Sequence, residues 1–154
     1  MTDVINKLNI LNKTISAMES CTGGALMNSF TNINGSSNVF KYGAVTYSNE
    51  FKIKMGVSES VIKQYTVYSN EVANEMSKSI SKFTNSNYGV GITGQINCFD
   101  VNNKVDNNNI VYISVYDRDN DCFYNDVFTC VDDTRENNKK MIVERVINIL
   151  NNIL

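Results

Sequence analysis

The sequence contains no histidine, and this absence removes several classes of site. A Ser-His-Asp triad, a Cys-His pair and a histidine-ligated zinc site all require an imidazole. Any general base in this protein must therefore be the side chain of an aspartate, glutamate, lysine, tyrosine or cysteine.

Other absences bear on where the protein works. There is no proline, and none of the four cysteines (Cys21, Cys98, Cys122 and Cys130) forms a C-x-x-C pair or an evident disulfide framework. No apolar run is long enough to span a bilayer, and residues 1–13 lack the basic start and apolar block of a signal peptide. We therefore expect a cytoplasmic protein in a reducing compartment, with no membrane partner.

The composition is that of a folded domain with little attraction for nucleic acid. Hydrophobic residues make up 42% and charged residues 19% of 154 positions, which predicts one globular domain over residues 1–154. The net charge of −2 argues against binding nucleic acid through bulk phosphate attraction. Asparagine fills about one position in six, so a single asparagine is weak evidence for a role.

The periodicity of apolar residues predicts alternating helices and strands. We expect helices over residues 2–12, 24–32, 58–65 and 70–83, and a last helix opened by residues 132–134. The apolar stripe of the helix over 70–83 is expected at Val72, Ala73, Met76, Ile80 and Phe83. Five aromatic residues are expected on the surface: Tyr42, Phe51, Tyr65, Tyr68 and Phe99. We expect strands over residues 13–18, 39–47, 88–93, 110–116 and 122–131, a polar turn at 36–38 and a long loop over 95–109. This order predicts an α/β fold: a three-layer α/β/α sandwich with a mixed, mostly parallel sheet.

One stretch, residues 16–26, combines the end of a strand, a tight glycine turn and the start of a helix. Such a turn directs backbone N–H groups and the positive end of a helix dipole at one point, where a phosphate or an oxyanion can bind. Ser20, Cys21 and Thr22 are candidate nucleophiles or hydrogen-bond donors there. The alternative is that Ser20 or Thr22 only caps the helix and the glycines only form the turn.

Three motifs agree with one family in order and spacing: Glu19-Ser20-Cys21-Thr22-Gly23-Gly24, Gly35-Ser36-Ser37 and Val45-Thr46-Tyr47-Ser48-Asn49-Glu50-Phe51-Lys52. Gly91-Ile92-Thr93-Gly94 continues the agreement. In these motifs the chain resembles the C-terminal domain of the competence/damage-inducible protein family, over residues 5–150. Stand-alone members of that family are nicotinamide mononucleotide amidohydrolases, which convert the carboxamide to a carboxylate and release ammonia.

The resemblance implies a catalytic serine and lysine, helped by a tyrosine, which fall on Ser20, Lys52 and Tyr47. This suits a chain without histidine, because a desolvated lysine with a depressed pKa can take the proton of a serine. Amide N–H groups of residues 21–24 would stabilise the oxyanion, and neither a metal nor an organic cofactor is required. The resemblance also implies a small nucleotide as substrate and a homo-oligomer. The substrate-binding residues expected from it are Cys21, Thr22, Gly23, Gly24, Ser36, Ser48, Asn49, Thr93, Gly94 and Arg135.

Two alternatives to these roles stay open from the residues themselves. Cys21 is a rival nucleophile, because a helix N-terminus lowers the pKa of a thiol. Arg135 and Lys139, at the start of the last helix, either meet a phosphate or lie on a solvated helix face.

The chain departs from the family after Gly94. The family continues with Ile-Ala-Gly-Pro and more glycines, whereas this chain has Gln95-Ile96-Asn97-Cys98-Phe99-Asp100 and later Asn107-Asn108-Asn109. We expect the side chains of Gln95, Ile96 and Asn97 to enter the space in which the family's backbone approaches its ligand. The competing hypothesis is therefore a non-catalytic nucleotide-binding or scaffold domain, with the substrate loop rebuilt.

Overall fold

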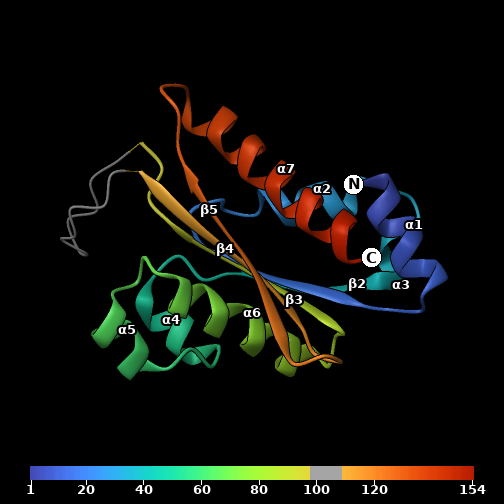
Figure 1. Cartoon of the computed structure of the whole chain (residues 1–154), viewed down its shortest axis with the longest axis horizontal. Helices are drawn as coiled ribbons and strands as arrows, with labels where there is room; N and C mark the ends of the chain where they lie inside the picture. Colours follow the sequence, from blue (N-terminus) through green and yellow to red (C-terminus); the bar gives the residue numbers. More distant parts are fainter. Residues whose placement is uncertain (98–108) are drawn as a thin grey trace.

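The computed structural model describes residues 1–97 and 109–154 and alternates helices with strands, as expected (Figure 1). The helices are α1 (Thr2–Ile10), α2 (Ala25–Thr31), α3 (Ser36–Val39), α4 (Asn49–Lys54), α5 (Glu59–Tyr65), α6 (Asn70–Thr84) and α7 (Arg135–Ile153). The strands are β1 (Ile15–Glu19), β2 (Phe40–Val45), β3 (Tyr88–Gly94), β4 (Ile110–Asp117) and β5 (Cys122–Thr129).

The five strands form one mixed sheet in the order β2-β1-β3-β4-β5. β1 pairs in parallel with both β2 and β3, while β4 pairs antiparallel with β3 and with β5. The expected α/β fold with a mixed sheet is confirmed, and its pairings divide evenly between parallel and antiparallel. Because β1, β2 and β3 are parallel neighbours, the loops that follow them leave the sheet at the same edge.

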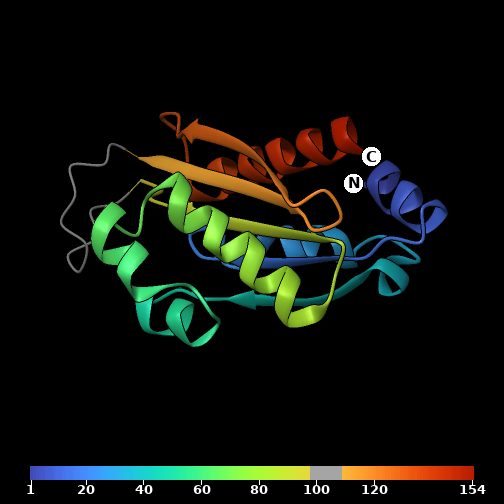
Figure 2. The same ribbon diagram turned by 60° about the horizontal axis from the view of Figure 1, so that its bottom comes forward.

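Helices cover both faces of the sheet. α1, α2 and α7 lie on one face, and α4, α5 and α6 lie on the other (Figures 1 and 2). Strand residues alternate between the faces: Ile15 and Ala17 of β1 belong to the core under α7, whereas Met18 packs with α6. The sheet and the helices on its two faces form the expected three-layer α/β/α sandwich.

Glycine in β3 allows α6 to approach the sheet closely. A Cβ atom on Gly91 would lie 2.3 Å from the carbonyl oxygen of Ala73 and 2.7 Å from the amide nitrogen of Ser77, both in the backbone of α6. No side chain fits at that distance, so the backbone of β3 itself forms the contact. Beside it, the hydroxyl groups of Ser77 and Ser114 are 2.9 Å apart and join α6 to β4.

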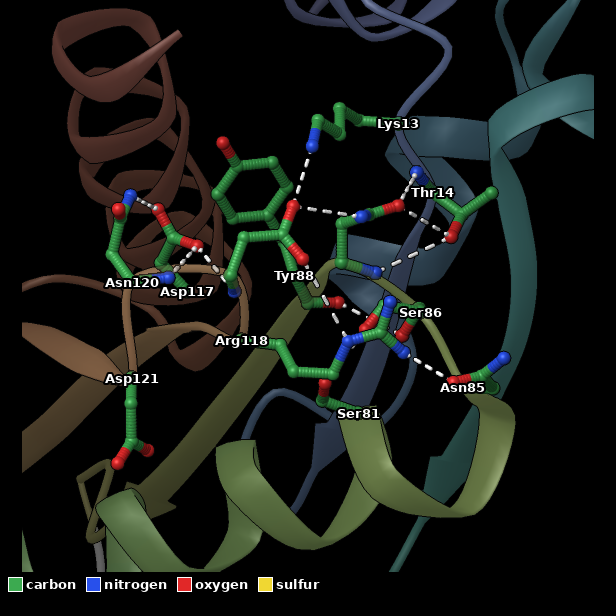
Figure 3. Close-up of polar contacts among 12 residues, drawn as sticks. Lys13, Thr14, Ser81, Asn85, Ser86, Tyr88, Asp117, Arg118, Asn120 and Asp121 are labelled. Carbon is green, nitrogen blue, oxygen red and sulfur yellow. Dashed lines mark hydrogen bonds and ion pairs between the residues drawn. The ribbon is translucent and has the colours of Figure 1, made fainter.

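Polar side chains tie the strands together at the end of the sheet where β1 begins (Figure 3). The Oδ1 atom of Asn87 accepts hydrogen bonds from the backbone N–H and the hydroxyl of Thr14, and Asn87 donates to Asp119 over 3.0 Å. Lys13 completes this set with an ion pair to Asp119, and Asp117 accepts from the amide N–H groups at the β4–β5 turn. Because these polar groups bond to one another, their role at this end of the sheet is to hold the strands together.

The structure corrects three local expectations. Residues 36–38, expected as a turn, begin the short helix α3. Phe83, expected in the apolar stripe of α6, is 65% exposed and packs only at the rim, with its ring 5.5 Å from that of Tyr42. Tyr68, expected on the surface, is buried among the residues around α6. No helix in the described parts of the chain is long and apolar enough to cross a membrane.

Candidate active site

Ser20 follows β1 directly, at the edge where the three parallel strands end. Its amide N–H donates to the carbonyl oxygen of Ile92 in β3 over 3.0 Å, which fixes the first residue of the turn against the sheet. Ser20 is 7% exposed. The Ser20 hydroxyl therefore follows the central strands directly and is largely shielded from solvent.

Lys52 reaches Ser20 from α4, the short helix that follows β2. The Ser48 hydroxyl caps this helix by accepting from the amide N–H of Phe51 over 3.3 Å, and Lys52 is its buried residue. The Nζ atom of Lys52 lies 3.1 Å from the Oγ of Ser20 and donates to the carbonyl oxygen of Thr46 over 2.8 Å. The expectation that Lys52 lies within reach of Ser20 is therefore confirmed.

Glu19, the residue before Ser20, occupies the N-terminus of α2. Its carboxylate is fully buried and accepts hydrogen bonds from the amide N–H groups of Gly24, Leu26 and Met27, at 3.0, 3.3 and 2.8 Å. A carboxylate in this place satisfies the free N–H groups of a helix start and its dipole. The helix N-terminus that was expected to receive a ligand anion is thus already filled by the protein.

The glycine turn leaves two of its amide groups available. Gly23 donates to the carbonyl oxygen of Ser20 over 3.1 Å, and Gly24 donates to Glu19, so two of the four amides that were expected to stabilise an oxyanion are engaged. Within residues 1–97 and 109–154, the N–H groups of Cys21 and Thr22 donate to no acceptor. These two amides follow the Ser20 side chain directly and are the ones that suit an oxyanion.

Cys21 does not have the character of a nucleophile. Its side chain is 5% exposed and belongs to the hydrophobic core. Burial raises the pKa of the Cys21 thiol to about 12, with the neighbouring Cys130 adding to the rise. The expectation that a helix N-terminus lowers this pKa is wrong, because α2 starts only at Ala25 and Glu19 occupies its N-terminus.

Tyr47 lies on the surface, five residues before Lys52 in the chain. Its side chain is 68% exposed, and its hydroxyl bonds to none of the described residues. Tyr47 is thus free to contact a ligand but does not position Ser20 or Lys52. Of the neighbouring candidates, Ser48 is the cap of α4 and Asn49 is its first residue.

Thr93 and Gly94 have structural partners in place of a ligand. The buried hydroxyl of Thr93 donates to the carbonyl oxygen of Val67 over 2.9 Å. A Cβ atom on Gly94 would lie 2.5 Å from the carbonyl oxygen of Ile110, so glycine is required there by the close approach of β4. Both residues lie at the correct edge of the sheet, yet these contacts account for them without a substrate.

Ser36 lies at the wrong end of the sheet for a residue that binds the same ligand as Ser20. It precedes β2, and the parallel register pairs Phe40 with Ile15 at the start of β1 and Val45 with Glu19 at its end. Ser36 and Ser20 are therefore separated by the length of β1, which is about 13 Å for five strand residues.

The segment after Gly94 packs against α7. The side chain of Ile96 is 1% exposed and enters the core, and Asn97 accepts a hydrogen bond from Asn138 over 3.1 Å. Arg135, expected to bind substrate, donates to the carbonyl oxygen of Ile96 instead. α7 thus gives Ile96 a core and Asn97 a polar partner, and Gln95 is likewise buried, while the expected entry of these three side chains into the ligand space stays a prediction. Residues 98–108 of the expected loop lie outside the described parts of the chain.

Lys139 lies one turn further along α7 and approaches the glycine turn. A Cβ atom on Gly23 would be 3.4 Å from the Nζ of Lys139, whose side chain is half-buried. Of the two cations expected near the site, Lys139 therefore approaches the turn that follows Ser20, while Arg135 holds the segment after β3.

Sequence reasoning missed two participants, Thr46 and Glu19. The Thr46 contact with Lys52 uses a backbone carbonyl, which has no sequence signature. Glu19 belongs to the motif around Ser20. Its position as an acid five residues before Gly24, just ahead of a helix start, was the feature of the sequence that could have predicted its contact with the helix N-terminus. In the described residues, no group of three or more Cys, Asp or Glu side chains is placed to hold a metal ion.

Comparison with known proteins matches one family over the whole chain. The family model described as "CinA C-terminal domain" matches residues 1–154. A competence-damage inducible protein of Thermoanaerobacter pseudethanolicus is 43% identical over 96 residues, covering 61% of this chain and 23% of that protein. One from Clostridium botulinum strain Kyoto is 46% identical over 92 residues, covering 59% and 22%. The chain thus spans less than a quarter of the length of these relatives.

Solved structures share the fold over nearly the whole chain. The competence/damage inducible protein CihA of Agrobacterium tumefaciens superposes with a TM-score of 0.84 at 26% identity, covering 97% of this chain and 92% of that one. A CinA superfamily protein of Klebsiella pneumoniae superposes with a TM-score of 0.87 at 20% identity, covering 97% and 91%. The second likeness concerns the fold alone.

Proposed function

Because the chain belongs to the family of the CinA C-terminal domain, we propose that it hydrolyses the carboxamide of nicotinamide mononucleotide to nicotinate mononucleotide and ammonia. Ser20 is the nucleophile and Lys52 its base. The observation that carries this proposal is the contact of 3.1 Å between Lys52 Nζ and Ser20 Oγ, with both side chains buried. A lysine is almost never fully buried without a special reason, and activation of a serine is such a reason.

The first half of the reaction acylates Ser20. Neutral Lys52 accepts the hydroxyl proton while the Oγ atom attacks the carbonyl carbon of the amide, and the negative charge moves to the carbonyl oxygen. The amide N–H groups of Cys21 and Thr22 donate to that oxyanion. The protonated Lys52 then transfers its proton to the nitrogen of the leaving group, the C–N bond breaks and ammonia departs.

The second half releases the acid. Lys52 accepts a proton from water, the resulting hydroxide attacks the ester carbon, and Lys52 returns the proton to Ser20 Oγ as the ester bond breaks. Lys52 must therefore be neutral at the start of each half. Burial disfavours a charged amine, and the 1% exposure of Lys52 supports this requirement. The carbonyl oxygen of Thr46 holds the amine in place by accepting one of its N–H groups.

Ammonia release from nicotinamide mononucleotide tests the proposal directly. Native protein should release ammonia, and Ser20→Ala should release none above the buffer rate. Ser37→Ala is a matched control, because Ser37 is exposed and precedes β2 at the far end of the sheet. Equal rates from native protein and Ser20→Ala, or no ammonia from native protein, would contradict the proposal and leave a non-catalytic nucleotide-binding domain as the better description.

The proposed substrate also fits a cytoplasmic location, where nucleotides are made and thiols stay reduced. Cys21, Cys122 and Cys130 are free thiols in the structure. Fractionation of source cells, with immunodetection of the chain, tests this location.

A further inference from the structure

Among the described residues, Lys139 is a cation without an anion. Glu136, the acid nearest to it on the same helix, pairs with Lys140 over 2.8 Å. Asp133 accepts hydrogen bonds from Asn137 and from the amide of Thr134. Across the described parts of the chain, Lys139 makes no ion pair and no hydrogen bond, although its side chain is half-buried.

The ammonium of Lys139 lies against the turn that carries the nucleophile. It is 3.4 Å from the position of a Cβ atom on Gly23, and the amide of Gly23 is itself 3.1 Å from the carbonyl oxygen of Ser20. Glycine at position 23 has φ +62°, which a side chain rarely adopts, so the Lys139 ammonium approaches the bare backbone of the turn.

The N-terminus of α2, the nearest helix start to the glycine turn, is not available to a ligand anion. Glu19 fills the N-terminus of α2 with its carboxylate, and α2 itself contains no charged residue. At the start of α7, the Thr134 hydroxyl accepts from the amide of Asn137, and Asp133 accepts from the amide of Thr134. One further polar group is unpaired in the same turn: the hydroxyl of Thr22, which is 1% exposed, has no partner.

We propose that Lys139 binds the phosphate of the substrate, and that the chain therefore selects phosphorylated nicotinamide compounds over unphosphorylated ones. The proposal rests on the proposed function for the identity of the ligand. With the amide carbon at Ser20 Oγ, the ribose spans the glycine turn and the phosphate meets the Lys139 ammonium. An ammonium is a compact charge that suits a phosphate, and the contact is a charge-assisted hydrogen bond.

The test compares two substrates that carry the same amide, nicotinamide mononucleotide and nicotinamide riboside. Native protein should prefer the mononucleotide. In Lys139→Gln, the ratio of kcat/KM for the mononucleotide over that for the riboside should fall about 10- to 100-fold, mainly through KM of the mononucleotide. Lys139→Arg should restore most of the preference. Lys140→Gln is the matched control: its side chain is exposed and pairs with Glu136, so the ratio should not change.

Equilibrium binding separates failure of this inference from failure of the proposed function. Titration calorimetry with nicotinamide mononucleotide should show binding to Ser20→Ala and a 10- to 100-fold weaker Kd in the Ser20→Ala, Lys139→Gln double variant. Binding that depends on Lys139 in a protein that never releases ammonia would support the phosphate site and refute the hydrolase. An unchanged substrate ratio together with an unchanged Kd in Lys139→Gln would overturn the inference, and so would the absence of any binding by native protein.

Discussion

The Nζ atom of Lys52 lies 3.1 Å from the Oγ of Ser20, although 32 residues separate them in the chain. Two features of the fold produce this contact. β2 pairs in parallel with β1, so both strands end at the same edge of the sheet, and the Ser48 cap starts α4 directly after β2. These features together place the Lys52 amine at the turn that follows β1.

Ser20 and Lys52 should behave as one unit in kinetics. Ser20→Ala and Lys52→Met should each reduce kcat for ammonia release by at least about 1000-fold, and the double variant should be no slower than the worse single one. The reason is that neither group transfers a proton without the other. Single-turnover assays with each variant measure this.

Lys54→Met provides the control for Lys52→Met. Lys54 belongs to the same helix, but it is largely exposed and pairs with Glu50. Its loss should leave kcat within a factor of two of the native value. Additive losses in the double variant would show that Ser20 and Lys52 act independently and would count against the proposed mechanism.

Glu19 should be required for stability. Glu19→Ala removes the acceptor for three amide N–H groups in a buried place, and each unsatisfied donor is costly. We expect the free energy of unfolding, measured by urea denaturation, to fall by about 3 kcal/mol or more. Glu19→Gln keeps one oxygen acceptor and should lose less.

Glu50→Gln is the control for Glu19. Its side chain is mostly exposed and its pair with Lys54 lies on the surface, so the change should be about 0.5 kcal/mol or less. A Glu19→Ala protein as stable as Glu50→Gln would mean that water satisfies the amides of α2 and that the carboxylate is dispensable for the fold.

Most of the helices and strands could be predicted from the sequence, because their apolar periodicity is strong. The apolar stripe of Val72, Ala73, Met76 and Ile80 predicted the position of α6 correctly. The expectation that Phe83 belongs to this stripe was wrong because Phe83 lies at the end of the helix, beyond the sheet. The sequence did not predict α3, because serine and asparagine, which fill positions 36–38, are common in turns. A helix of four residues also shows no apolar periodicity.

For the site, the motifs located Ser20 and Lys52, while the roles of their neighbours depended on contacts that no local pattern encodes. The residues after Gly94 show this best. Ile96 has no periodic companions, so its burial beneath α7 follows only from the position of Asn138 and Arg135 in space. Likewise, Thr93 was expected from the sequence to bind substrate, but in the fold its hydroxyl donates to the carbonyl oxygen of Val67.

The chain should form at least a homodimer. Several large apolar side chains are exposed, among them Tyr42, Phe51 and Tyr65 at 42, 54 and 42%. β2 is also an edge strand with unpaired backbone groups. Light scattering at working concentration should give at least twice the mass of one chain, 17.3 kDa. A mass of one chain would contradict this expectation.

The thiol of Cys21 should be unreactive in the folded protein near neutral pH. Burial raises its pKa to about 12, so at pH 8 only about one molecule in ten thousand carries the reactive thiolate. Iodoacetamide at pH 8, followed by peptide mass spectrometry, should leave Cys21 unmodified in native protein. The same cysteine should be alkylated rapidly in urea, where burial is lost.

The same raised pKa predicts the sign of a pH effect on stability. An unfolded chain releases the Cys21 proton near its ordinary pKa of 9.0, whereas the folded chain holds it to about 12. The folded state therefore binds more protons between these values, and its stability falls as pH rises from 9 toward 12. In urea denaturation, Cys21→Ala should show a shallower loss between pH 9 and 11 than native protein. Parallel curves, or alkylation of folded Cys21 at the rate seen in urea, would show that the thiol ionises freely and would restore it as a rival nucleophile to Ser20.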